Sequence, residues 1–376
     1  ILLRSPQPTT DNPQPTYNPP LTTDNPAGQH ECFPAHSAAM LAFVDQRRAG
    51  PGLILMAAAA VLYLASRAAV AAMARADGSD PGRRALGQWL PIAAAAIAAA
   101  LMKQADVAVS IVFGTSVALL SLVVGMVLYL APMQSLPVSR RVWPFVLPSA
   151  LLTLIAGFSG RLTWWHAIMF LALGGAILPV WLDSPDEPNA QGDSPPARNW
   201  AGVLIGGALM ASIIGGVLAV MGTVASTQYP RVLTAVAMAA AILSPLLALP
   251  TLGTATALAQ RGHAGRALSA IVGTVILNLC VLLPMVIFLS YAGLWFNVTN
   301  TGGAHLAFDA GHIAGRAAPY PMIAWRIETV LLVVLGFALV PVSMGKWMLG
   351  RMESSLLVLG YAAYLLAVIA YGLNIA

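Results

Sequence analysis

The sequence predicts an all-α integral membrane protein with ten membrane-spanning helices. Of its 376 residues, 58% are hydrophobic and only 9% are charged, whereas soluble domains carry about 25% charged residues. Several stretches exceed the roughly 18 apolar residues that indicate a spanning helix. These stretches are rich in Ala and lack the period-2 alternation of barrel strands. The composition therefore excludes a soluble protein, and the lipid bilayer is the first expected partner.

Charge and cysteine content exclude further classes of protein. The net charge is +5, but the 19 Lys and Arg residues are scattered between apolar segments, as in the loops of membrane proteins rather than in nucleic-acid-binding patches. Two cysteines, Cys32 and Cys280, are too few for a disulfide framework or a Cys-based zinc site. The sequence contains no nucleotide-binding loop and no nucleophile–His–acid set. We therefore expect neither an enzyme nor a cofactor.

The chain divides into a Pro-rich start and two groups of five spans. We expect residues 1–49 to be a Pro-rich, disordered N-terminal segment, to which we assign no fold or function. Residues 1–39 are either a disordered tail or upstream sequence that is not native. A polar linker at 183–199 separates the first five-helix group, 50–182, from the second, 200–376. The expected spans are 51–74, 86–103, 105–131, 142–159, 162–182, 200–222, 233–259, 267–291, 328–349 and 353–374.

Loop charges indicate an orientation. The loops after odd-numbered spans hold ten Lys and Arg residues, against seven on the opposite side. Because positive loops stay in the cytoplasm, the linker is expected there, with both termini outside. We expect the location to be a bacterial inner membrane.

An internal repeat relates the two groups. Pro91 lies 23 residues before Gly114, and Pro250 lies 23 residues before Gly273, so the copies are offset by 159. Residues 91–120 and 250–279 share ten identities. Five spans separate the copies, so the second enters the membrane inverted. Inverted repeats with Pro-interrupted helices are typical of secondary transporters; a duplicated scaffold without a pathway is the alternative.

These residues resemble the α-repeats of the sodium/calcium exchanger family. The first copy runs from Leu90-Pro91-Ile92 past Asp106 to Gly114-Thr115-Ser116, and the second from Leu249-Pro250-Thr251 through Gly273-Thr274 to Asn278. The resemblance covers about residues 50 to 375 and implies two inverted five-helix repeats, a cytoplasmic linker and cation antiport by alternating access.

The departures from the family pattern concern its carboxylates. The two α-repeat glutamates of the family correspond to Ile92 and Thr251, and an acidic position of its first helix corresponds to Arg67. We expect no Asp or Glu in the middle of a span, with Glu328 and Glu353 opening their helices. Calcium takes six to eight oxygens, several of them carboxylate, whereas neutral oxygens can replace the hydration shell of a monovalent ion. A monovalent cation such as sodium or a proton is therefore the expected ion.

The expected ion pathway follows the repeat helices. Its residues are Pro91, Ile92, Ser110, Gly114, Thr115, Ser116, Pro250, Thr251, Ser269, Gly273, Thr274 and Asn278. Any one of these hydroxyls could instead serve helix packing with a bond to its own backbone. Arg67 either snorkels to the interface or places a fixed positive charge where a cation would bind.

A weak metal candidate lies in the loop between spans eight and nine. His305, Asp309 and His312 are spaced i, i+4, i+7, which would put them on one helix face. No fourth ligand accompanies them, and an ordinary loop is the alternative.

Two functions remain open from the sequence. The first is a divergent secondary cation antiporter with an altered, non-carboxylate ion site. The second is a transport-inactive relative that acts as a membrane scaffold or regulatory partner. The sequence names no protein partner.

Overall fold

A computed structural model describes residues 81–101, 104–131, 145–182, 235–292, 294–298, 304–308, 318–343 and 350–375. All of them belong to the second of two units, Ala49–Ala376, the first being Ile1–Arg48. The Pro-rich segment 1–49, the expected spans at 51–74 and 200–222, and the linker 183–199 lie outside the described residues.

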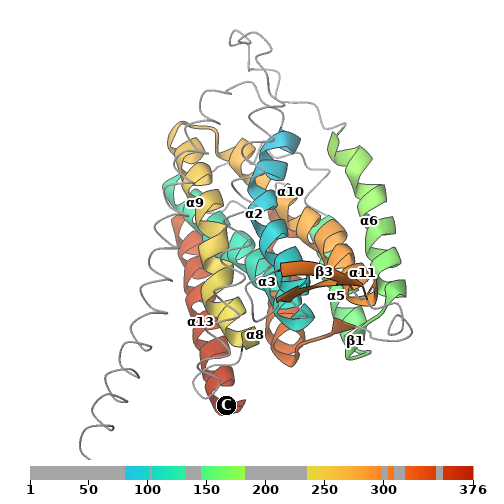
Figure 1. The fold of residues 1–376 in the computed structure, drawn as a ribbon. Helices are drawn as coiled ribbons and strands as arrows, with labels where there is room; N and C mark the ends of the chain where they lie inside the picture. The colour runs from blue at the N-terminus through green and yellow to red at the C-terminus, as the bar shows by residue number, and fades with distance from the viewer. Residues whose placement is uncertain are drawn as a thin grey trace, which may run out of the picture. The chain divides into compact units, whose positions relative to one another are not determined.

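The described chain is dominated by apolar helices (Figure 1). Before the linker they are α2 (Pro81–Leu101), α3 (Ala105–Ala118) with the π-helix η1 (Leu119–Val123) and α4 (Val124–Leu130), α5 (Val146–Gly157) and α6 (Trp164–Leu182). After it they are α8 (Ala235–Met238), η3 (Ala239–Leu243), α9 (Ser244–Gln260), α10 (Ala264–Leu277), η4 (Asn278–Leu282), α11 (Leu283–Ala292), η6 (Ala324–Thr329), α12 (Val330–Ser343) and α13 (Arg351–Ile375). These helices coincide with eight of the ten expected spans.

Length and composition allow four of the described helices to cross a membrane. They are Ala105–Leu130, Val236–Gln260, Ala264–Ala292 and Arg351–Tyr371. At about 1.5 Å per residue, helices of this length match the roughly 30 Å hydrocarbon core of a bilayer.

Burial separates central helices from peripheral ones. Residues 107–118 of α3 and 270–277 of α10 are all buried, as expected for helices that are apolar on every side. Figure 1 shows α6 and α13 on opposite sides, with α2, α3 and α10 between them. The outer helices α12 and α13 expose large apolar side chains such as Phe337 and Leu366. Such side chains suit contact with lipid tails rather than water.

The two repeat segments have matching local structure. Helix α3 and α10 begin 159 residues apart, and η1 and η4 begin and end at the same offset. The turns before them also match, because Gln104 N–H donates to the Ala99 carbonyl at 3.0 Å and His263 N–H to the Leu258 carbonyl at 2.9 Å. The backbone thus repeats at the offset found in the sequence.

Two short antiparallel sheets connect the helices. Strand β1 (Arg161–Leu162) pairs with β4 (Ala318–Pro319), and β2 (Leu294–Val298) pairs with β3 (Ala304–Phe308). His305 lies in β3 opposite Asn297, so the helix expected through His305 is wrong. Aromatic and β-branched residues of β2 favour a strand, and the Asn-Thr-Gly-Gly sequence at 300–303 favours a turn.

Candidate functional site

Asn278 joins the two central helices. It is the first residue of η4, and its Nδ2 donates to Thr115 Oγ1 and to Ser116 Oγ of α3, both at 3.3 Å. All three side chains are fully buried. The two hydroxyls can accept these bonds because they donate their own protons to carbonyls of α3, those of Ile111 and Val112. Three of the expected pathway residues are therefore brought together.

The side-chain amide oxygen of Asn278, Oδ1, is buried without a hydrogen-bond partner in the described chain. Burying an unpaired polar oxygen costs free energy, about 1–3 kcal/mol. The oxygen of an amide is also a ligand for alkali and alkaline-earth cations. A cation bound here would satisfy an oxygen that the described residues leave unpaired.

A second polar group surrounds Gln88 of α2. The Gln88 Nε2 donates to Thr254 Oγ1 of α9 at 3.0 Å, and Thr274 Oγ1 of α10 lies 3.4 Å from Gln88 Oε1. Thr251, one turn before Thr254, is fully buried and its hydroxyl has no partner among the described residues. Gln88 was not among the predicted site residues, although a polar residue three positions before Pro91 in an apolar stretch is a visible signal.

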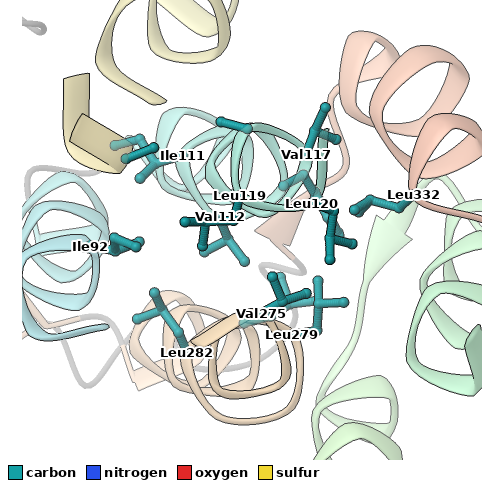
Figure 2. Close-up of a cluster of buried hydrophobic side chains, with 14 of the residues drawn as sticks. Ile92, Ile111, Val112, Val117, Leu119, Leu120, Val275, Leu279, Leu282 and Leu332 are labelled. Carbon is teal, nitrogen blue, oxygen red and sulfur yellow. The ribbon is translucent and has the colours of Figure 1, made fainter. Parts of the chain in front are cut away.

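The two positions expected to correspond to the family's glutamates have different surroundings. Ile92 is fully buried in an apolar cluster with Ile111, Val112 and Leu282, as Figure 2 shows. Thr251 lies beside the polar group around Gln88, because its carbonyl accepts a bond from Thr254. One half of the expected ion centre is therefore filled with hydrocarbon, and the other half retains oxygens.

The remaining expected pathway residues fall on the same helices. Pro91 lies inside α2 and Pro250 inside α9, and each removes one helical N–H donor. Ser110 of α3 is buried and donates to the Val236 carbonyl at 3.2 Å, whereas its repeat partner Ser269 is only half-buried. The matched serines therefore do not share one environment.

The two glycines of the repeat are buried within α3 and α10. Gly114 lies against the helix formed by η3 and α9. A Cβ atom at Gly114 would approach Ser244 Cβ to 3.0 Å and Ala240 Cα to 3.3 Å. Gly273 occupies the equivalent position in α10, at the offset of 159. Close helix contact at small residues is typical of membrane interiors.

Glu328 is a buried carboxylate, and the prediction that it opens its helix is wrong. Helical structure begins at Met322, so Glu328 lies inside the helix, within η6, rather than opening it. Its side chain is fully buried. The Tyr364 hydroxyl of α13 donates to Glu328 Oε1 at 2.9 Å, and Oε2 has no hydrogen-bond partner in the described chain. The exposed Arg326 made the stretch look like a loop, although the helix already includes it.

Three other expected candidates are not described by the structure. Arg67 lies outside the described residues, as do Asp309 and His312. The described chain contains no group of three or more His, Cys, Asp or Glu side chains that could hold a metal ion.

Comparisons with known proteins identify relatives of this arrangement. Residues 84–178 match the model of the family described as sodium/calcium exchanger protein. The fold is similar to the sodium-calcium exchanger NCX_Mj soaked with 2.5 mM Na⁺ and 0.1 mM Ca²⁺, with a TM-score of 0.53 and 17% identity over 84% of this chain and 95% of that one. It is also similar to the H⁺/Ca²⁺ exchanger CAX, with a TM-score of 0.58 and 13% identity over 86% of this chain and 84% of that one.

No curated protein matches the sequence. At identities this low, the similarity to the two exchangers shows a shared fold alone. The family match covers the region from α2 to α6. The apolar helices agree with the membrane location of such proteins. Residues 84–178 of this integral membrane protein therefore match the sodium/calcium exchanger family.

Proposed function

We propose that the protein is a secondary cation antiporter that works by alternating access, rather than an enzyme. The observation that carries the proposal is the buried contact of Asn278 with Thr115 and Ser116, which leaves Asn278 Oδ1 without a partner in the described chain. This contact joins helices α3 and α10, which have matching π-helical interruptions. The family match over residues 84–178 and the fold shared with cation exchangers support the same function.

The charges favour a monovalent ion in this proposal. The α-repeat helices carry Ile92 and Thr251 where the family has glutamates, so a divalent ion would meet only neutral oxygens there. A divalent charge is poorly compensated by neutral ligands in a medium of low dielectric constant. A sodium ion or a proton places a smaller demand on the site.

The proposed architecture has ten spans in two inverted five-helix repeats. The common offset of 159 in sequence and backbone supports the repeat, and the loop charges support termini outside and a cytoplasmic linker in a bacterial inner membrane. Three spans would separate the exposed residues Arg161 and Arg261. Cysteines substituted at these two positions should therefore react with an impermeant maleimide from opposite sides. Labelling of both from one side would contradict the topology.

Flux measurements with purified protein in liposomes test the function. A sodium or proton gradient should drive counter-flux of a cation. Asn278→Leu should reduce this flux at least tenfold, because it removes the side-chain amide. Leucine is chosen because it already stands at the repeat-equivalent position 119. The matched control is Ser121→Ala, because Ser121 is also buried but donates only to the Val117 carbonyl of its own helix. Equal flux in wild type and Asn278→Leu would reject this site, and robust calcium uptake driven by sodium would reject the monovalent assignment.

A transport-inactive membrane scaffold or regulatory partner is the second candidate. The observation that favours it is the apolar cluster around Ile92, which fills the place of a family carboxylate (Figure 2). This function predicts a folded protein in liposomes with no gradient-driven flux of sodium, protons, potassium or calcium.

A further inference from the structure

Glu328 lies outside the α-repeat helices but contacts one of them. It belongs to η6, and the hydroxyl of Ser110 in α3 interacts with its carboxyl group. The same Ser110 hydroxyl donates to the Val236 carbonyl of α8 at 3.2 Å. Ser110 therefore connects the carboxyl group of Glu328 to helices of both repeat segments.

Among the described residues, the titratable groups that interact with Glu328 are tyrosines. Tyr364 of α13 donates to Oε1, and Tyr361 one turn earlier interacts electrostatically with the carboxyl group, as does Tyr320 before η6. On α3 the titratable residue is Asp106, which accepts a hydrogen bond from Val107 N–H at the start of its own helix. Helices α5, α8 and α12 bring no titratable residue to η6.

No described Lys, Arg or His forms an ion pair with Glu328, and Arg326 on the same helix is exposed. An ionised carboxylate that is fully buried without a cation costs several kcal/mol. The hydroxyl of Tyr361 is likewise buried without a partner among the described residues. Hydroxyl neighbours can serve both forms of the acid, since a hydroxyl donates to a carboxylate and accepts from a carboxylic acid.

We propose that Glu328 is a proton-binding site within the membrane, and that its proton is exchanged against the transported cation. Loss of the proton from the carboxyl group leaves a carboxylate, and the proton leaves with water on the side to which the centre is open. One carboxyl group takes one proton and needs no cavity for an ion. The exchange step rests on the proposed antiport function, whereas the proton site does not.

Ser110 gives this site a connection to the repeats. Its hydroxyl has one proton, which it donates to the Val236 carbonyl. An ionised Glu328 is a stronger acceptor than a neutral carbonyl group, so deprotonation draws the Ser110 proton away from Val236. The bond between α3 and α8 therefore weakens when Glu328 loses its proton.

Carbodiimide labelling of the full-length protein in detergent tests the proton site directly. Dicyclohexylcarbodiimide adds to protonated carboxyl groups in apolar surroundings, and peptide mass spectrometry locates the adduct. Glu328 should be labelled at mildly acidic pH and several-fold less at alkaline pH. Glu353 is the internal control, because its side chain is exposed and accepts a bond from Gly350 N–H.

The outcomes separate this inference from the proposed function. Absent labelling of Glu328, or labelling that does not change with pH, would each overturn the proton site, whatever the flux. Labelling that follows pH in a protein without flux would keep the proton site and reject the antiporter. In the flux assay, Glu328→Gln should abolish proton counter-flux, with circular dichroism confirming the fold. Unchanged proton counter-flux in this variant would overturn the exchange step.

Discussion

Gln88 and Asn278 connect helices across the two repeat segments through hydroxyl groups. Gln88 of α2 contacts Thr254 of α9 and Thr274 of α10, and Asn278 contacts the Thr115–Ser116 pair of α3. Amide side chains suit this role because one group both donates and accepts. In a membrane interior, such interhelical bonds contribute modestly to stability, about 0.6 kcal/mol on average.

Gln88→Leu should therefore lower the free energy of unfolding by only about 1 kcal/mol. The hydroxyls that contact Gln88 keep other acceptors in this variant. Thr254 donates to the Thr251 carbonyl at 3.0 Å, and Thr274 donates to the Ala270 carbonyl at 2.8 Å. Leucine already occupies the repeat-equivalent position 247. Thermal unfolding in detergent measures the change, with Gln88→Glu as the control that keeps the shape. A loss above about 3 kcal/mol would mean that Gln88 is a main stabilising contact.

The polar residues that meet between α3 and α10 were predictable from the sequence, because they lie within the internal repeat. The sequence identified Thr115, Ser116 and Asn278, and the structure brings them together. Their role in ion transport stays a prediction. The neighbours of Glu328, Ser110 and Tyr364, were not predictable, because hydropathy gives no information on contacts between residues that are remote in sequence.

The helices themselves followed from hydropathy, but their internal irregularities did not. The π-helical segments η1 and η4 occur at matching positions, and π segments are frequent at functional sites. Apolar periodicity cannot distinguish a π turn within a helix that is apolar on every side. The hairpin of β2 and β3 was not predicted for a different reason. The i, i+4, i+7 spacing that begins at His305 favoured a helix, whereas the aromatic residues Trp295 and Phe296 favour a strand.

Gly114 determines how closely α3 approaches the η3–α9 helix. Gly114→Ala should destabilise the protein by about 1–3 kcal/mol, because the new methyl group would press against Ser244 and the backbone of Ala240. Ser244→Gly removes the nearest atoms, so the double variant should recover much of the loss beyond the cost of glycine in a helix, about 1 kcal/mol. A double-mutant cycle by thermal unfolding measures this coupling. Strictly additive losses would show that the two residues do not meet.

At the scale of the whole molecule, the ten-span, two-repeat architecture is a prediction from the sequence pattern. The described helices coincide with eight of the ten expected spans, and the backbone of α3 and α10 repeats at the offset of 159. Hydropathy and the repeat carry the fold, since any apolar helix of suitable length satisfies the bilayer. The ion site depends instead on which side chains meet at the centre. Ile92 and Thr251 illustrate this, because equivalent positions have apolar surroundings in one repeat and polar surroundings in the other.

We predict that the protein lacks the calcium binding of the family because of the residues at Ile92 and Thr251, and not because its fold differs. Ile92→Glu alone should be strongly destabilising, since it places a carboxyl group among Ile111, Val112 and Leu282 (Figure 2).

In the double variant with Thr251→Glu, a cation bound between the two carboxylates would offset this cost, and each single variant would bind much less. By mass action, the double variant should gain about 2.7 kcal/mol at a hundredfold excess of calcium over the dissociation constant. Thermal unfolding with and without calcium measures the gain, and adding Arg67→Asp tests for an opposing charge. Double and triple variants that fold but show no calcium-dependent stabilisation would contradict the correspondence of these positions to the exchanger site.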